Sequence, residues 1–142
     1  MVDSTPRRAL FAAAAAGPVG PAAASAGGLA VWQPHTPSSE VLLVGVLLAP
    51  FVEEIVFRGG LHTLLRERLV LGRAGLGPLS WANIITSLVF AALHVVLQHA
   101  LVATWVLVPS LLLGWVYDRT ARLAPVIGLH GFYNALWLSL LV

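Results

Sequence analysis

Two adjacent glutamates near the end of one apolar segment could do acid–base chemistry. Glu53 and Glu54 stand side by side, and Arg58 follows Glu54 by four residues. In a helix this spacing places Glu54 and Arg58 on one face, where they can pair. Glu53 lies about 100° around the helix and is left without a local partner. A carboxylate in this position can serve as the general base that activates a water molecule.

Two further apolar segments carry polar side chains one helical turn apart. His94 follows Phe90 by four residues in one segment, and Asn134 follows His130 by four in the other. Polar side chains inside a membrane are costly, and they usually face the bundle interior and pair there. We therefore expect these groups and the glutamates to form one site. Hydrolysis of an amide bond needs a base beside a water molecule and donors that face the developing negative charge.

The composition indicates that lipid surrounds most of the chain. Of its 142 residues, 58% are hydrophobic and 10% are charged, with a mean hydropathy of +0.88. A soluble domain carries about 25% charged residues, so a water-soluble globule is excluded. The chain has no cysteine, which excludes disulfides, thiolate metal sites and cysteine nucleophiles.

The apolar runs predict an all-α integral membrane helical bundle, because a membrane-spanning helix needs roughly 20 apolar residues. About five transmembrane helices are expected, at residues 9–32, 41–57, 80–98, 100–117 and 124–142. Leucines at helical spacing, with arginines between them, predict a short cytoplasmic amphipathic helix near 61–70. We expect residues 1–142 to form a single membrane domain, in which 1–40 supply the N-terminal span and outer loop and 41–142 the catalytic core.

The first segment has a second interpretation. Arg7 and Arg8 precede an alanine-rich run, and Ala24-Ser25-Ala26 resembles a signal-peptide cleavage site. Cleavage there would leave the orientation of the following spans unchanged.

The positive charges predict the orientation in the membrane. All eight basic residues are arginines, and in one orientation all of them lie on the cytoplasmic side, as the positive-inside rule requires. The N-terminus is then cytoplasmic and the C-terminus lies outside. Because the arginine clusters are topology signals, we expect no nucleic-acid partner.

The three short motifs, taken in order, resemble a known family. Glu53-Glu54-x-x-x-Arg58, Phe90-x-x-x-His94 and His130-x-x-x-Asn134 are similar to the motifs of the CAAX protease and bacteriocin-processing (CPBP, or Abi) family of intramembrane proteases. This family includes the type II CAAX prenyl endopeptidases, and the resemblance covers about residues 41–142.

A further segment also resembles the family. Gly114, Asp118-Arg119-Thr120 and Pro125 are similar to the residues that lead into its last motif. That segment more often has Thr-Gly-Ser in the family, and Ala121 and Arg122 depart from this pattern.

The resemblance implies a role for each motif residue. Glu53 would activate the attacking water with help from His94, while His130 and Asn134 would stabilise the tetrahedral oxyanion. The remaining two residues of the expected catalytic set, Glu54 and Arg58, would support and orient the site. No serine nucleophile is required, and Ser87 is expected to be a small helix-packing residue.

No cofactor is expected, with zinc as the open alternative. Catalytic zinc takes three protein ligands and a water, and Glu53, His94 and His130 would then be the ligands. Asn134 suits an oxyanion donor better than a zinc ligand. The remaining histidines, His35, His62 and His99, are expected to be exposed surface residues.

The predicted function is that of an intramembrane endopeptidase that cleaves a membrane-associated or C-terminally anchored client, as in protein sorting. Two alternatives stay open: a catalytically silent membrane protein, such as a bacteriocin immunity factor or scaffold, and a small ion or proton pathway. A compact chain that is rich in alanine and has arginine as its sole basic residue looks bacterial. Its expected location is the bacterial inner membrane, and its expected partners are the lipid bilayer and a membrane-anchored substrate.

Overall fold

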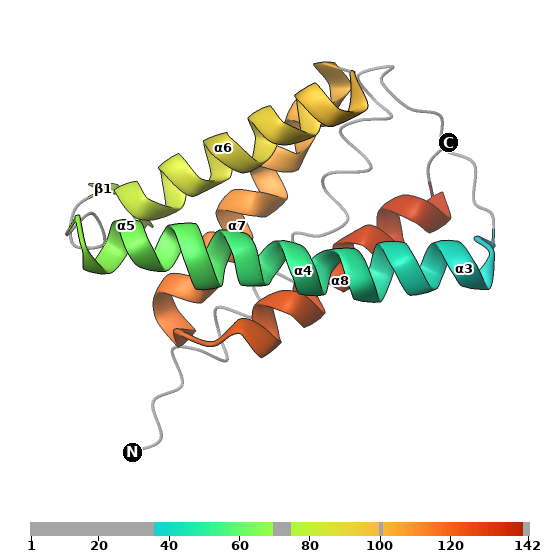
Figure 1. Ribbon diagram of the computed structural model, residues 1–142, viewed down its shortest axis with the longest axis horizontal. Coiled ribbons are helices and arrows are strands. Elements are labelled where there is room, and N and C mark those ends of the chain that lie inside the picture. Colours follow the sequence, from blue (N-terminus) through green and yellow to red (C-terminus); the bar gives the residue numbers. More distant parts are fainter. Residues whose placement is uncertain (1–35, 70–74, 100, 141–142) are drawn as a thin grey trace.

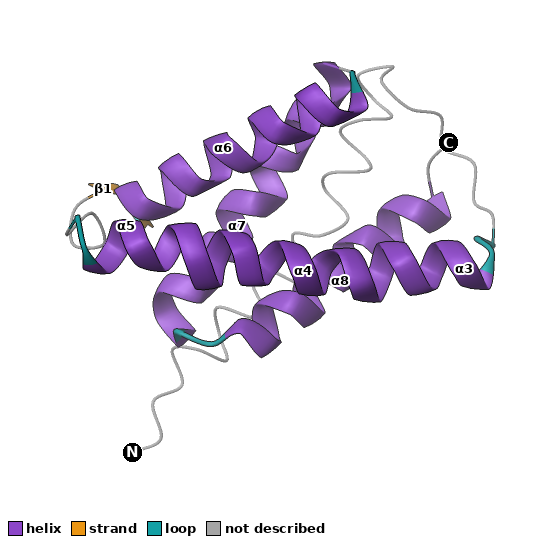
Figure 2. Ribbon diagram, in the orientation of Figure 1, coloured by secondary structure: helices purple, strands orange, loops and turns teal. Residues whose placement is uncertain are grey.

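The computed structural model describes residues 36–69, 75–99 and 101–140, and these are almost entirely helical (Figures 1 and 2). This confirms the predicted all-α class for the described part of the chain. The segment 9–32 and His35 lie outside the described residues, as does the choice between a span and a signal peptide.

One uninterrupted helix occupies residues 39–67, and we call it the long helix. The backbone stays right-handed helical through the junctions of its five stretches, which are α3 (Ser39–Leu42), η1 (Leu43–Leu48), α4 (Ala49–Glu54), η2 (Ile55–His62) and α5 (Thr63–Glu67). The stretches η1 and η2 have π-helical hydrogen bonding, a geometry that is frequent at functional sites.

The prediction of a separate amphipathic helix near 61–70 is wrong in one respect. The segment is helical as far as Glu67, but it continues the long helix without a break. Gly59 and Gly60 do not end the helix, because Thr63 holds the turn that follows them. Its backbone N–H donates to the carbonyls of Arg58 and Gly60, and its hydroxyl donates to the Arg58 carbonyl at 2.8 Å.

A two-stranded antiparallel hairpin leads into the second part of the bundle. It consists of β1 (Gly75–Leu76) and β2 (Leu79–Ser80), with Gly77 at a φ of 60° in the turn. Ser80 then caps α6 (Trp81–Gln98), because its hydroxyl accepts from the Asn83 N–H at 3.0 Å.

The remaining helices are η3 (Leu101–Val106), α7 (Leu107–Thr120) and α8 (Leu123–Leu140). The expected span 80–98 corresponds to α6, and 124–142 corresponds to α8. The expected span 100–117 begins as the 3₁₀ helix η3 and continues as α7. Among the described residues, α6 and α8 are the two helices long and apolar enough to cross a membrane. The structure therefore supports the prediction of a membrane protein, but it does not confirm the five predicted spans.

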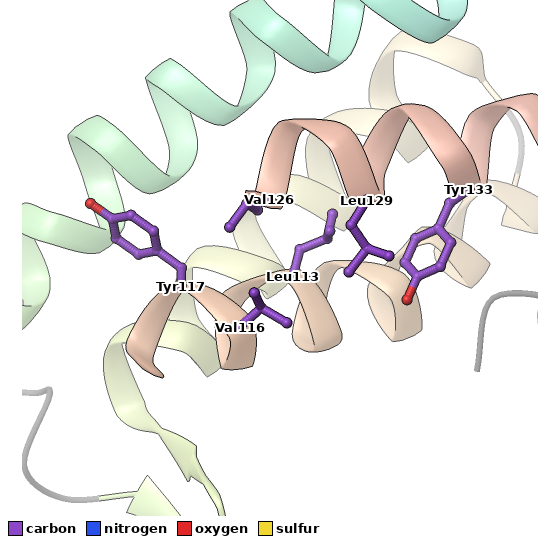
Figure 3. Close-up of a cluster of buried hydrophobic side chains, with 6 residues drawn as sticks. All are labelled: Leu113, Val116, Tyr117, Val126, Leu129 and Tyr133. Atoms are coloured by element: carbon purple, nitrogen blue, oxygen red, sulfur yellow. The ribbon is translucent and has the colours of Figure 1, made fainter. Parts of the chain in front are cut away.

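The other helices pack along different parts of the long helix. In Figure 1, α6 runs beside the long helix near α5 and diverges from it toward α3, whereas α8 lies behind the α3–α4 part. The helix α7 packs against both α6 and α8. A buried apolar cluster joins α7 to α8, and its members are Leu113, Val116, Tyr117, Val126, Leu129 and Tyr133 (Figure 3).

Polar and apolar side chains are distributed as expected for a helix bundle in lipid. Large apolar side chains of the long helix point outward, including Leu47, Phe51, Val52 and Val56. Fully buried side chains, by contrast, include Glu54, Arg58, His62 and Asn83. A polar interior beneath an apolar surface suits a site that works inside a bilayer.

Candidate active site

A buried glutamate connects the long helix to α8. Arg58 Nη1 lies 3.1 Å from Oε1 of Glu54, and both side chains are fully buried, which confirms the pairing predicted from their spacing. Oε1 of Glu54 also lies 2.7 Å from Nδ1 of His130. A carboxylate paired with arginine can only accept, so Nδ1 of His130 carries the hydrogen and donates it. The hydrogen bond thereby fixes the orientation of the His130 ring.

The second glutamate faces the other side of the same ring. Oε2 of Glu53 lies 3.6 Å from Nε2 of His130. The Glu53 side chain is 29% exposed, whereas that of Glu54 is fully buried. Two adjacent carboxylates thus have different surroundings: Glu54 is held by Arg58 and His130, and Glu53 stands at an accessible edge of the site.

The ring of Phe90 connects His94 to this cluster. The ring of Phe90 is 4.3 Å from that of His94 and 6.0 Å from that of His130, measured between centroids. Nδ1 of His94 lies 3.0 Å from the Phe90 carbonyl oxygen, which can only accept. In the neutral ring of His94, Nε2 is then left as an acceptor.

Asn134 binds the backbone of the long helix. Its Nδ2 donates to the carbonyl of Gly45 at 2.8 Å. In η1 the Ala49 N–H donates to the Val44 carbonyl, five residues earlier. By the same pattern, the Gly45 carbonyl would accept from the backbone N–H of residue 50. That residue is Pro50, which has no N–H. Asn134 supplies the missing donor and retains a second N–H on the same nitrogen.

Small residues let α8 approach the long helix closely at this point. A Cβ added to Gly131 would lie 2.5 Å from the Val46 carbonyl oxygen, and one added to Gly45 would lie 2.8 Å from Leu138 Cδ1. The contact requires glycine at Gly131, where the neighbour is backbone, whereas at Gly45 the neighbour is the end of a flexible leucine side chain. It brings Asn134 and His130, which flank Gly131 on α8, against the long helix.

A chain of buried hydroxyl and amide groups holds the other end of Arg58. Its Nη2 donates to the hydroxyl and the carbonyl of Ser110, at 2.7 and 2.8 Å. The Ser110 hydroxyl donates to Ser87 at 3.0 Å, and Ser87 donates to Oδ1 of Asn83 at 3.1 Å. The expectation that Ser87 serves only as a small packing residue is therefore wrong, because its hydroxyl takes part in this chain.

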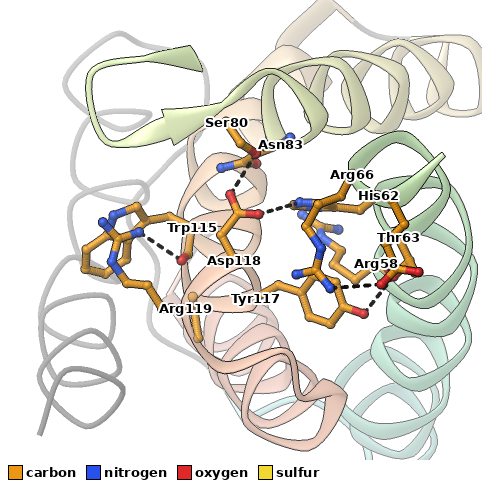
Figure 4. A network of polar contacts seen from close by, with 12 residues as sticks. Arg58, His62, Thr63, Arg66, Ser80, Asn83, Trp115, Tyr117, Asp118 and Arg119 are labelled. Atoms are coloured by element: carbon orange, nitrogen blue, oxygen red, sulfur yellow. Dashed lines mark hydrogen bonds and ion pairs between the residues drawn. The ribbon is translucent and has the colours of Figure 1, made fainter. Parts of the chain in front are cut away.

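A second polar cluster, which was not predicted from the sequence, is drawn in Figure 4. His62 Nε2 lies 2.9 Å from Oδ1 of Asp118, and the Ser80 hydroxyl donates to Oδ2 of Asp118 at 2.8 Å. His62 is fully buried, so its predicted surface exposure is wrong. Its spacing offered a signal, because His62 follows Arg58 by four residues and Glu54 by eight, on one buried face. His99 is exposed as predicted, at the left-handed end of α6.

The proposed zinc ligands do not form a ligand set. Within residues 36–69, 75–99 and 101–140, no three His, Asp or Glu side chains are grouped so as to hold a metal ion. Glu53 lies beside His130, at 3.6 Å from its Nε2, but His94 does not complete a group of three with them. Glu53, His94 and His130 therefore do not fit a bound zinc ion in this geometry.

Comparison with known proteins points to one family. The family model described as type II CAAX prenyl endopeptidase Rce1-like matches residues 37–136. Neither the curated proteins nor the solved structures gave a match. The matched range includes the long helix, α6, α7 and α8 as far as Leu136, and thus all six residues of the expected catalytic set. Since the match extends over more than two thirds of the sequence, the chain belongs to the type II CAAX prenyl endopeptidase Rce1-like family.

Proposed function

We propose that the chain is an intramembrane endopeptidase in which Glu53 activates the attacking water. Membership of the family implies a membrane-embedded protease of the CAAX type. The observation that carries the assignment of Glu53 is the position of His130 between the two glutamates. Glu54 is committed to Arg58 and to Nδ1 of His130, so Glu53, beside Nε2, is the carboxylate left for a proton transfer.

In the proposed reaction, Glu53 takes a proton from water as the water oxygen bonds to the carbonyl carbon of the client. Nε2 of His94 accepts from the same water and orients it. The carbonyl oxygen becomes an oxyanion, which His130 stabilises through Nε2–H in its protonated form and Asn134 through its second amide hydrogen. Glu53 then passes the proton to the amide nitrogen as the C–N bond breaks.

The proposed substrate is a peptide bond in a membrane-associated or C-terminally anchored client. The proposed location is a bacterial inner membrane, with the C-terminal end of α8 outside. The buried polar cluster and the apolar outer surface support a site that clients reach from within the bilayer. The buried ion pair between Glu54 and Arg58 favours a fixed hydrolytic site over an ion pathway. Arg58 neutralises the charge of Glu54, which an ion pathway would need to bind its ion.

The experiment is co-expression with two reporters. One carries a C-terminal membrane helix followed by a basic tail, and the other is a prenylated protein ending in a CAAX sequence. Glu53→Gln removes the base with little change in volume, and Glu40→Gln is the matched control, since Glu40 is an exposed glutamate of the same long helix.

We expect the wild type and Glu40→Gln to cleave one reporter and Glu53→Gln to leave it intact at an equal protein level. The reporter that is cleaved identifies the client class. Cleavage by Glu53→Gln at the wild-type rate would exclude Glu53 as the base.

A further inference from the structure

The hydrogen bonds beyond Arg58 have a fixed direction. A guanidinium has no acceptor, so the Ser110 hydroxyl that accepts from Arg58 must send its own hydrogen elsewhere. It donates to Ser87, and Ser87 in turn donates to Oδ1 of Asn83. Nδ2 of Asn83 then donates to the Leu111 carbonyl at 3.0 Å. Each group accepts on the side of Arg58 and donates away from it.

The far end of this chain is held in place by the packing of α6 against α7. A Cβ added to Gly114 of α7 would overlap the side chain of Asn83, so the asparagine lies directly on the α7 backbone. Ser87 and Asn83 are fully buried, and Ser110 is nearly so. Buried polar groups that satisfy one another in this way rigidify their surroundings.

The guanidinium links this rigid chain to the active site. Nη2 of Arg58 binds Ser110 while Nη1 binds Glu54, which holds the ring of His130. The two nitrogens belong to one planar group. Without the Ser110 hydroxyl, Nη2 keeps only the Ser110 carbonyl as an acceptor. The guanidinium plane is then held less firmly on this side, and the hydrogen bond that orients His130 weakens.

We propose that Ser110, Ser87 and Asn83 are positioning residues for catalysis, which act through Arg58 and Glu54 to set the orientation of His130. The proposal rests on the proposed proteolytic function. It assigns to α6 and α7 a part in the reaction that does not require contact with the client.

The test measures steady-state cleavage of the reporter by purified protein in proteoliposomes. Ser110→Ala and Ser87→Ala are the test variants. The control is Thr86→Val, because Thr86 is a fully buried neighbour of Ser87 whose hydroxyl has no hydrogen-bond partner among the described residues. We expect Ser110→Ala to lower kcat about tenfold or more, as for loss of a hydrogen bond to a charged group, with KM unchanged. Thr86→Val should retain the wild-type kcat.

A double-mutant cycle separates positioning from a general loss of structure. Arg58→Lys keeps the charge but lacks the planar fork that spans Glu54 and Ser110. In that background we expect Ser110→Ala to change kcat by less than about twofold, because the connection is already broken. Equal effects of Ser110→Ala in both backgrounds would overturn the proposal.

Nuclear magnetic resonance gives a readout that does not depend on proteolysis. The ¹⁵N signals of the His130 ring can be assigned by their loss in His130→Gln. They should shift in Ser110→Ala and in Ser87→Ala, but not in Thr86→Val. Unchanged His130 signals in both alanine variants would overturn the positioning role even if no reporter were cleaved. A wild type that cleaves neither reporter, with the His130 shifts as expected, would contradict the proposed function alone.

Discussion

Nδ1 of His130 and Oε1 of Glu54 lie 2.7 Å apart, although 76 residues separate them in the sequence. The same oxygen lies 3.1 Å from Arg58 Nη1. One buried carboxylate oxygen therefore joins α8 to the long helix and compensates the charge of a buried arginine. The orientation of the His130 ring depends on this ion pair, which makes Arg58 important for both folding and activity.

Arg58→Met should strongly destabilise the fold, because it leaves Glu54 buried without its counter-charge. Removing one partner of a buried ion pair lowers the free energy of unfolding by about 3–5 kcal/mol. The measurement is the unfolding midpoint of the protein in detergent, which should fall. The double variant Glu54→Gln/Arg58→Met should recover part of the loss, since no uncompensated charge remains.

The matched control for this prediction is Arg66→Met. Arg66 lies 3.5 Å from Glu67, whose side chain is 60% exposed, and exposed pairs contribute about 0–1 kcal/mol. Similar unfolding midpoints for Arg58→Met and Arg66→Met would contradict the buried pairing.

Gly131→Ala should separate α8 from the long helix. The added methyl group would lie 2.5 Å from the Val46 carbonyl oxygen, so one helix must shift. Overpacking of this kind costs about 1–3 kcal/mol. Gly128→Ala is the control, because a Cβ at Gly128 meets no atom within 4 Å. Thermal unfolding of the two variants side by side checks the prediction, and equal stability would show that the contact is not tight.

Pro50→Ala should weaken the hold on Asn134. The new N–H at residue 50 can donate to the Gly45 carbonyl, which Asn134 now satisfies at 2.8 Å. We expect kcat to fall with no loss of thermal stability, because the long helix gains a backbone hydrogen bond.

Pro109→Ala is the control for this variant. Pro109 lies in the first turn of α7, on a different helix from the Gly45 carbonyl that Asn134 binds. A wild-type kcat in Pro50→Ala would show that Asn134 does not depend on the proline.

Ala121→Gly should stabilise the protein. Ala121 ends α7 with a φ of 49°, a left-handed conformation that costs a residue with a side chain about 1–2 kcal/mol. Glycine adopts it freely. Ala124→Gly, in the first turn of α8, should instead destabilise by about 0.5–1 kcal/mol. Both are measured by denaturant unfolding, and a lower midpoint for Ala121→Gly would refute the predicted strain.

Local geometry could be predicted from the sequence. The pairing of Glu54 with Arg58 follows from helical periodicity alone. The same periodicity predicts that Glu53 lies on a different face and does not pair with Arg58. Apolar length was sufficient to identify α6 and α8, because an apolar run of about 20 residues has few other structures available. The catalytic roles of these residues stay predictions.

Contacts between distant helices were decided only by the tertiary structure. Spacing could not show that His130 meets Glu54, that Asn134 binds the Gly45 carbonyl or that His62 is buried against Asp118. Each depends on how closely two helices approach and at what rotation, and these are set by glycines and side-chain packing along the whole interface. The sequence by itself determined which residues share a helix face, whereas the packing of the helices determined which faces meet.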